Sequence, residues 1–167
     1  TYLNMNKPDS ALYMAQIGHD KAVAIESDRI RSQVLKTIGT VYKIQGNNQL
    51  AKQNYLQAIA ASKKMNELVD VAGGYLLLAR LFIDLKQNDS AVYYAEKAYE
   101  IGRPRSYKAI VISAGNMLSR LLEPRDPAEA LRYLKIANGA RDSVYNIQKE
   151  QSAQAMMFKE KERQAEL

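Results

Sequence analysis

Apolar residues recur along the chain at two intervals: the three- and four-residue spacing of a helix, and a much longer interval. The longer interval is clearest at four alanines, Ala11, Ala51, Ala91 and Ala130, which are spaced 40, 40 and 39 apart. Each alanine is followed seven residues later by a small residue and preceded nine residues earlier by a bulky one. The small residues are Gly18, Ala58, Ala98 and Ala137, and the bulky ones are Tyr2, Tyr42, Phe82 and Leu121. Three positions in register over four copies indicate an internal repeat.

Each copy contains two helical stretches separated by turn-forming residues, and no alternating strand pattern competes with them. Turns are expected at Gly46–Asn48 and Lys86–Asp89. Asp126 precedes Pro127 and lies three residues before Glu129, which is typical of a capped helix start. The pattern therefore predicts an all-α chain, with helices near residues 9–24, 26–45, 49–64, 67–86, 89–101, 106–123 and 127–138.

In the best-formed copy, the first helix contains two bulky apolar residues, a glycine and an aromatic residue. The second helix contains an aromatic residue between two alanines. These residues are Leu35, Ile38, Gly39, Tyr42, Ala51, Tyr55 and Ala58. Their spacing resembles the tetratricopeptide repeat (TPR), whose helix–turn–helix unit is about 34 residues long. The resemblance covers residues 1–145, as one partial repeat and three whole ones with a period of about 40. It implies a right-handed superhelix of antiparallel helix pairs, although the last copy lacks the small residue of its first helix.

Residues 146–167 contain no glycine or proline, so we expect one long helix there, serving as a linker or a cap. Val144, Ile147, Ala155 and Phe158 form a thin apolar stripe along it. The segment 142–145, Asp-Ser-Val-Tyr, followed by a Lys/Glu/Gln-rich helix, resembles the end of sensor regions in bacterial membrane receptors. In those receptors TPR arrays precede a histidine kinase or a helix-turn-helix domain. Two arrangements stay open: the tail packs on the repeats of its own or a second copy, or it projects as a linker.

The amino-acid composition excludes several kinds of functional site. Of the 167 residues, 47% are apolar and 25% are charged, which is typical of a folded domain. There is no cysteine and only one histidine, His19, so disulfides, thiolate metal sites and multi-histidine sites are excluded. No apolar run reaches the length of about 20 residues that spans a membrane. Because the chain begins at Thr1, we expect a fragment or a processed product.

Catalytic motifs are missing from the sequence. It contains no nucleophile elbow, zinc-binding helix motif or phosphate-binding glycine loop. The pair Gly73-Gly74 is interpreted as a site of close helix packing, and His19 as a surface or helix-end residue. We therefore expect a non-catalytic chain with no cofactor and no metal. A kinase domain downstream of this fragment stays compatible with that expectation.

A basic stripe follows one face of the helix predicted at 26–45. It consists of Arg29, Gln33, Lys36, Thr40 and Lys43, at 4-3-4-3 spacing. Residues 1–66 hold nine Lys and Arg against four Asp and Glu, whereas the remaining residues add a net charge of only +1. The stripe is either a solvated face or a wall that accepts acidic side chains or a terminal carboxylate. Chaperone-binding TPR proteins use a Lys/Asn/Arg clamp for such ligands, but Thr40 stands where that clamp has Asn.

The centre of the array is also expected to contribute to a ligand groove. The helix at 67–86 is apolar almost all round, which places Leu76, Leu77 and Ile83 towards the concave side. Gly115 is expected to leave room in the groove beside Ile112. The complete set of groove candidates is Arg29, Gln33, Lys36, Thr40, Lys43, Leu76, Leu77, Arg80, Ile83, Ile112, Asn116 and Ser119.

These observations favour a protein- or peptide-interaction module, with a ligand that carries acidic groups. Resemblance favours the sensor region of a bacterial signal-transduction receptor in the periplasm, anchored through a membrane segment outside this fragment. The alternative is a cytoplasmic TPR scaffold or peptide-responsive regulator. A monomer and a homodimer formed through the C-terminal helix both stay open. Nucleic-acid binding is disfavoured because the net charge is only +6 and the longest basic run is Lys63-Lys64.

Overall fold

The computed structural model of the chain describes Tyr13 and residues 15–18, 20–21 and 27–165, in which all regular secondary structure is helical. The predicted all-α class is therefore confirmed for this part of the chain. The described residues include only part of the helix expected at 9–24, and they include neither Tyr2 nor His19. From residue 27 onwards the helices are α2 (Asp28–Ile44), α3 (Asn48–Lys64), α4 (Leu68–Asp84), α5 (Asn88–Gly102), α6 (Lys108–Leu122) and α7 (Pro127–Ala165).

One helix and its turn form the repeating structural unit, because α2 to α6 begin at residues 28, 48, 68, 88 and 108. Each turn passes through one residue with positive φ, and these residues are Gly46, Asn66, Lys86 and Ser106. The amide that follows each of them donates to a carbonyl five residues earlier, as from Asn47 to Tyr42 at 2.8 Å. This is the hydrogen bond of a Schellman turn, which ends a helix and reverses the chain. The sequence repeat is therefore two such units.

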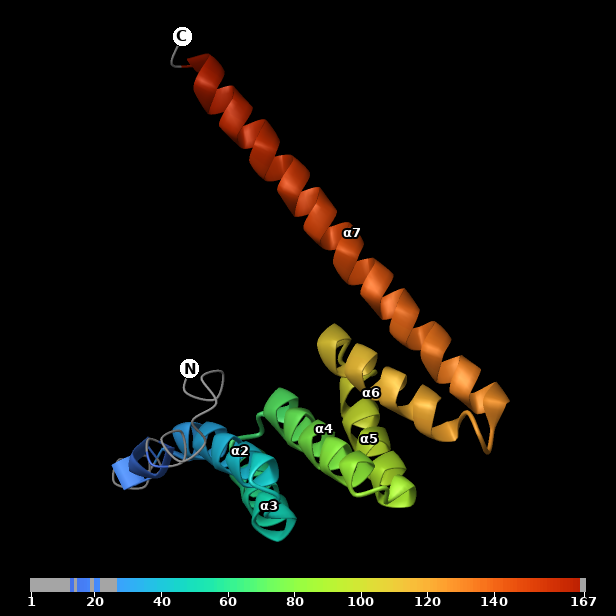
Figure 1. The fold of residues 1–167 in the computed structure, drawn as a ribbon. Coiled ribbons are helices and arrows are strands. Elements are labelled where there is room, and N and C mark those ends of the chain that lie inside the picture. The colour runs from blue at the N-terminus through green and yellow to red at the C-terminus, as the bar shows by residue number, and fades with distance from the viewer. Residues whose placement is uncertain (1–12, 14, 19, 22–26, 166–167) are drawn as a thin grey trace.

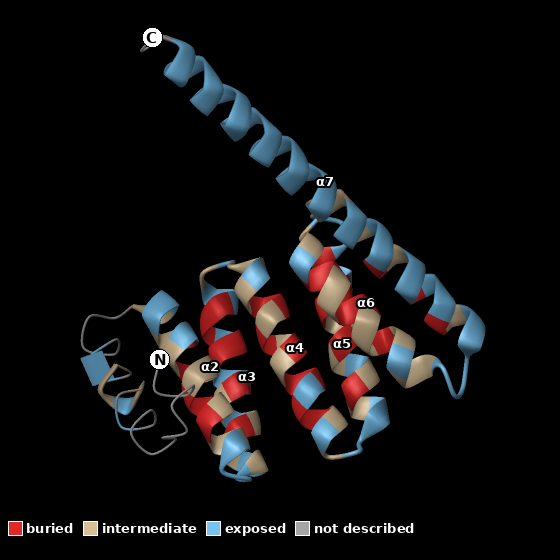
Figure 2. Cartoon of the chain, turned by 45° about the horizontal axis from the view of Figure 1, so that its top comes forward, coloured by how far each residue is buried: buried red, intermediate tan, exposed pale blue. Residues whose placement is uncertain are grey.

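The helices stack in a row, and each packs against its neighbours in sequence (Figure 1). In addition, α4 touches both α2 and α6, so the first helices of successive pairs lie next to one another. Every helix from α2 to α7 contains buried residues where it packs on its neighbours (Figure 2). Tyr55, Leu78 and Leu118 are among the fully buried ones. All of the groove candidates belong to these three helices, α2, α4 and α6.

Glycine allows neighbouring helices to approach closely at two crossings. A Cβ atom on Gly39 would lie 2.6 Å from the ring of Tyr55, and one on Gly74 would lie 2.4 Å from the Ile59 side chain. Contacts that short do not occur between real side chains, so only glycine fits without displacement. The predicted burial of Ala51 and Ala91 is confirmed, because neither is exposed to solvent.

Two expectations about glycine need correction. A Cβ on Gly73 would meet nothing within 4 Å, so only Gly74 of the pair serves close packing. Gly115 does not leave room in a ligand groove. A Cβ there would lie 3.0 Å from the Cβ of Ala137, so this glycine accommodates α7 instead.

The C-terminal helix is longer than expected. The sequence predicts a helix ending near residue 138 and a separate tail helix, but α7 runs without a break for 39 residues. Gly139 lies inside it in open space and does not end it. The helix packs on α6 through Ala130, Tyr133 and Ala137, and its side chains from residue 146 to 164 are all exposed. It projects from the array (Figures 1 and 2), so the expectation that the tail packs on its own repeats is wrong for these residues.

Replacing Gly74 with alanine tests the close approach of α3 and α4. We expect the free energy of unfolding to fall by about 1–3 kcal/mol, because the new methyl group would overlap Ile59. The neighbouring change Gly73→Ala is the matched control. It should raise stability by up to about 1 kcal/mol, because alanine favours helix and the space is open. Urea unfolding of both variants measures this, and a shift of the same sign in both would contradict the packing described.

Candidate functional site

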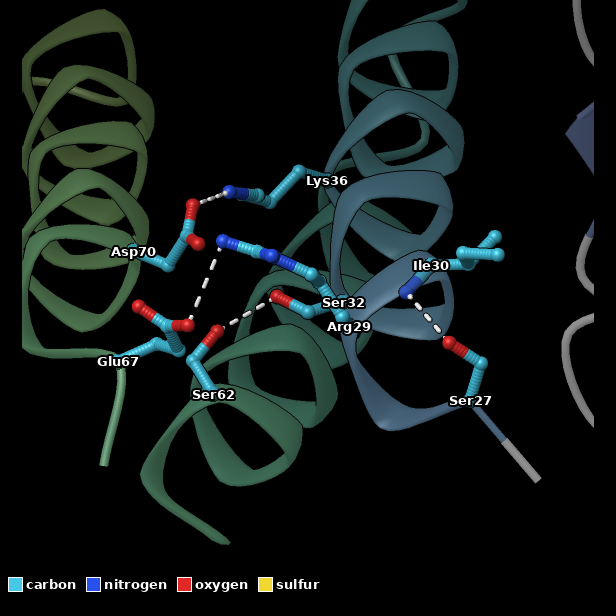
Figure 3. Close-up of polar contacts among 8 residues, drawn as sticks. All are labelled: Ser27, Arg29, Ile30, Ser32, Lys36, Ser62, Glu67 and Asp70. Carbon is cyan, nitrogen blue, oxygen red and sulfur yellow. Dashed lines mark hydrogen bonds and ion pairs between the residues drawn. The ribbon is translucent and has the colours of Figure 1, made fainter. Parts of the chain in front are cut away.

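Three of the four basic residues of α2 are paired with carboxylates in or directly before α4. Lys36 Nζ lies 2.5 Å from Asp70, and Lys43 Nζ lies 2.6 Å from Asp84. Arg29 reaches Glu67 at 3.4 Å in the more exposed pair (Figure 3). These three ion pairs form a ladder between two helices that lie side by side.

The ladder changes the interpretation of the basic stripe. Its three cations do not form an uncompensated wall, because each faces a carboxylate across the α2–α4 contact. Three of the five excess positive charges in residues 1–66 are balanced by these partners, Glu67, Asp70 and Asp84, which lie beyond that segment. The expectation of an open basic wall at Lys36 and Lys43 is therefore corrected.

Thr40 is also engaged within the protein. Its hydroxyl donates to the carbonyl of Lys36 at 2.8 Å and lies 3.2 Å from the Tyr55 hydroxyl. Burial raises the pKa of Tyr55, although the hydrogen bond with Thr40 and the charge of Arg80 act in the opposite direction. The phenol therefore stays protonated at neutral pH. These contacts join α2 to α3, as does the buried hydroxyl pair Ser32–Ser62 at 2.6 Å (Figure 3).

An open pocket lies between α4 and α6 and has a volume of about 430 Å³. Its wall combines apolar side chains with polar groups that can donate hydrogen bonds. The lining residues are Arg80, Ile83, Ser113, Asn116, Met117, Arg120 and Leu121. No carboxylate is among the lining residues.

The two arginines of this pocket differ from the cations of α2. Both are exposed, and among the described residues neither forms an ion pair with a carboxylate. Asp84, which is one helical turn from Arg80 on α4, is paired with Lys43. A guanidinium is protonated at any physiological pH and presents up to five donors in a planar fork. The pocket therefore combines two permanent positive charges with a neutral amide and a hydroxyl.

The structure separates the sequence candidates into groups. Arg80, Ile83 and Asn116 line the pocket. Leu77, Ile112 and Ser119 are half-buried and are not part of its lining, and Gln33 is an exposed residue of α2. Leu76 is only 7% exposed and belongs to the core between α4, α5 and α6, so its assignment to the groove is wrong. The lining residues that the sequence interpretation missed are Ser113, Met117, Arg120 and Leu121.

The repeat spacing could have identified Arg120 as a residue of the pocket. Thr40, Arg80 and Arg120 are separated from one another by one sequence repeat, so they occupy the same position in three successive first helices. A position that faces the groove in one repeat faces it in the next, because the units stack with the same geometry. In this series the first member is engaged with Tyr55, and the other two line the pocket.

No model of a known protein family matches the chain, and no curated protein sequence is significantly similar to it. In the part of the chain that the structure describes, no group of three His, Cys, Asp or Glu side chains is placed to bind a metal. Of the helices described, none combines the length and apolar character needed to cross a membrane. Function is therefore inferred from the pocket and from the shape of the array.

A double-mutant cycle tests the ladder, using Lys36→Met, Asp70→Asn and the double variant. We expect a coupling energy of about 0.5–1 kcal/mol for this pair, because both side chains are largely withdrawn from solvent. The coupling should decrease as salt screens it. The corresponding cycle at Arg29 and Glu67 is the control, and it should give a value near zero because both groups are more exposed. Equal couplings at the two pairs, from chemical unfolding, would contradict the geometry described.

Proposed function

We propose that this chain is a non-catalytic protein- or peptide-interaction module of the TPR type, whose ligand binds in the groove over α4 and α6. The observation that carries the proposal is the pocket whose lining combines Arg80 and Arg120 with apolar side chains. A likeness to TPR arrays in the repeat spacing and in the stacked helix pairs supports the same assignment. Repeat arrays commonly use such an extended surface to bind other proteins.

The chemistry of the pocket favours a ligand with a carboxylate next to an apolar group. Arg80 and Arg120 can donate charge-assisted hydrogen bonds to a carboxylate, while Asn116 and Ser113 provide neutral polar partners. Ile83, Met117 and Leu121 offer an apolar surface to a neighbouring side chain. The flexible side chain of Met117 suits ligands of more than one shape. An acidic peptide segment, or a peptide C-terminus with an apolar last residue, has both features.

Binding is a better assignment for this pocket than proton transfer. The ionisable side chains in its lining are arginines, which do not release a proton at physiological pH. General acid–base catalysis requires a group with a pKa near the operating pH. The lining instead resembles a recognition site, in which fixed donors orient an anionic group.

We further propose that the module is the sensor region of a bacterial signal-transduction receptor, such as a histidine kinase, in the periplasm. The geometry of α7 supports this proposal, because one uninterrupted helix leaves the array and extends away from it (Figure 1). Such a helix can transmit a displacement of the repeats to a distant domain. A cytoplasmic scaffold or peptide-responsive regulator is the second candidate, supported by the same groove. A membrane-spanning segment encoded after α7 in the complete gene would favour the receptor.

Binding of acidic peptides tests the proposed ligand class. The probes are fluorescein-labelled peptides with Asp or Glu beside Leu, each made with a free and with an amidated C-terminus. We expect the double variant Arg80→Gln, Arg120→Gln to bind at least about tenfold more weakly, since each charge-assisted hydrogen bond contributes about 1.5–3 kcal/mol. Fluorescence anisotropy at low and high salt measures the affinity, which should fall as salt rises.

The control is the double variant Lys36→Gln, Asp70→Asn, which removes both members of an existing ion pair and leaves the Lys43–Asp84 pair in place. We expect it to change the affinity less than about twofold, because a neutralised cation contributes little to a distant anion. An equal loss in both double variants would contradict the assignment of the pocket. Failure of the whole acidic set to bind the unmodified protein would contradict the ligand class.

A further inference from the structure

The last helix leaves open a face that the equivalent helices α3 and α5 bury. Tyr55 in α3 packs against Gly39 of α2 and shares a core cluster with α4, and Ala95 in α5 shares one with α4 and α6. Both are at most 1% exposed because a helix lies on each side of them. The residue at the same repeat position in α7 is Leu134, which is 37% exposed. Leu134 follows the buried Tyr133 by one residue, so it points about 100° away from the surface that packs on α6.

The open face continues along the projecting part of α7. Tyr145 is 64% exposed and Met156 is 71% exposed. Leu134, Tyr145 and Met156 are spaced 11 residues apart, which corresponds to about three helical turns. The three side chains therefore lie on one nearly straight face of the helix. Exposed apolar side chains aligned in this way mark an interaction surface rather than scattered surface residues.

The equal spacing on the two sides of Tyr145 gives this face a two-fold pattern. We propose that it is covered by α7 of a second copy of the chain, in an antiparallel pair with the two-fold axis at Tyr145. In this pair Leu134 of each copy lies opposite Met156 of the other, and the two Tyr145 rings meet at the axis. Each apolar contact lies about 16 Å from the axis, at 1.5 Å per residue. An interface of this kind uses the same patch on both copies, as two-fold dimers require.

Charges beside Tyr145 are complementary in the antiparallel pair. Asp142 and Lys149 are exposed, and at about 100° per residue both lie to the same side of the Tyr145 direction. In the antiparallel pair, Asp142 of each copy lies on the same side as Lys149 of the other copy. The two residues are offset by only one residue along the helix axis. Arg141 lies to the opposite side, where the neutral Gln148 of the other copy is at the corresponding level. The pairing therefore gains two attractive contacts and brings no like charges together on either side.

The stability of the projecting helix gives a second reason for a covering partner. The side chains from residue 146 to 164 are all exposed in the single chain. Most of the stability of helices in proteins comes from packing against other elements, and this segment has no such packing in the single chain. In the antiparallel pair this segment lies along the array end of the second copy, where Leu131 and Leu134 are exposed. A parallel pair would place the two unsupported segments against each other, whereas the antiparallel pair sets each of them against the array end of the other copy.

Disulfide trapping tests the proposal, because the chain contains no cysteine of its own. The variants Leu134→Cys and Met156→Cys are purified separately, then oxidised alone and as an equimolar mixture. The antiparallel pair predicts a cross-linked dimer in the mixture that mass spectrometry shows to contain one copy of each variant. Each variant alone should stay uncross-linked, because its two cysteines would lie about 33 Å apart. Self-cross-linking of Leu134→Cys alone, or no cross-link in the mixture, would overturn the proposal.

Light scattering and sedimentation of the full chain provide an independent test. Tyr145→Glu places two carboxylates against each other at the axis and should weaken the dimer at least about tenfold. Phe158→Glu is the matched control: Phe158 is equally exposed, at 63%, but its position on the helix turns it about 140° away from Tyr145. It should leave the dimer intact, and circular dichroism should show unchanged helix content in both variants. A monomeric unmodified chain up to millimolar concentration, or equal dissociation by both variants, would overturn the proposal.

Discussion

Close approach of neighbouring helices is the constraint on which the rest of this structure depends. Tyr55 lies against Gly39, Ile59 against Gly74 and Ala137 against Gly115, so a small residue on one helix receives a larger side chain or the backbone of the next. The three glycines occupy different positions of the repeat, but α2 to α6 begin at equal intervals along the chain, so equivalent residues recur on successive helices. That regularity brings the first helices of successive pairs side by side, and it aligns Thr40, Arg80 and Arg120 on one surface.

The charged residues on that surface fall into two groups, one that pairs within the protein and one that we assign to ligand binding. The cations of α2 are used within the protein, where Lys36 and Lys43 pair with carboxylates of α4 and hold the two helices in register. Arg80 on α4 and Arg120 on α6 have no such partners among the described residues, and they line a pocket together with apolar side chains. A cation without an internal partner is free to bind an external anion, which is why we propose the ligand site at α4 and α6 rather than at α2.

Several features of the fold were predictable from the sequence because they depend on local pattern. The spacing of Ala51 and Ala91 indicated buried helix crossings, and the turn at Gly46 marked a helix end. The direction of Leu76 was not predictable, because a helix that is apolar nearly all round has no polar face to orient it. The partners of Lys36 and Lys43 were hidden because ion pairs join residues far apart in sequence. The length of α7 was missed because a glycine inside a helix costs only about 1 kcal/mol, which α7 tolerates at Gly139.

The central claim about this surface is that the ligand contacts Arg80 and Arg120 and not the paired cations. A titration with an acidic peptide that has a free C-terminus tests this claim directly. The arginine Nε–Hε signals are followed in a nitrogen-15 correlation spectrum. We expect the signals of Arg80 and Arg120 to move in a saturable way, while that of Arg29, which lies on α2 and is not part of the pocket lining, stays in place. Movement of the Arg29 signal, with those of Arg80 and Arg120 unchanged, would contradict the claim.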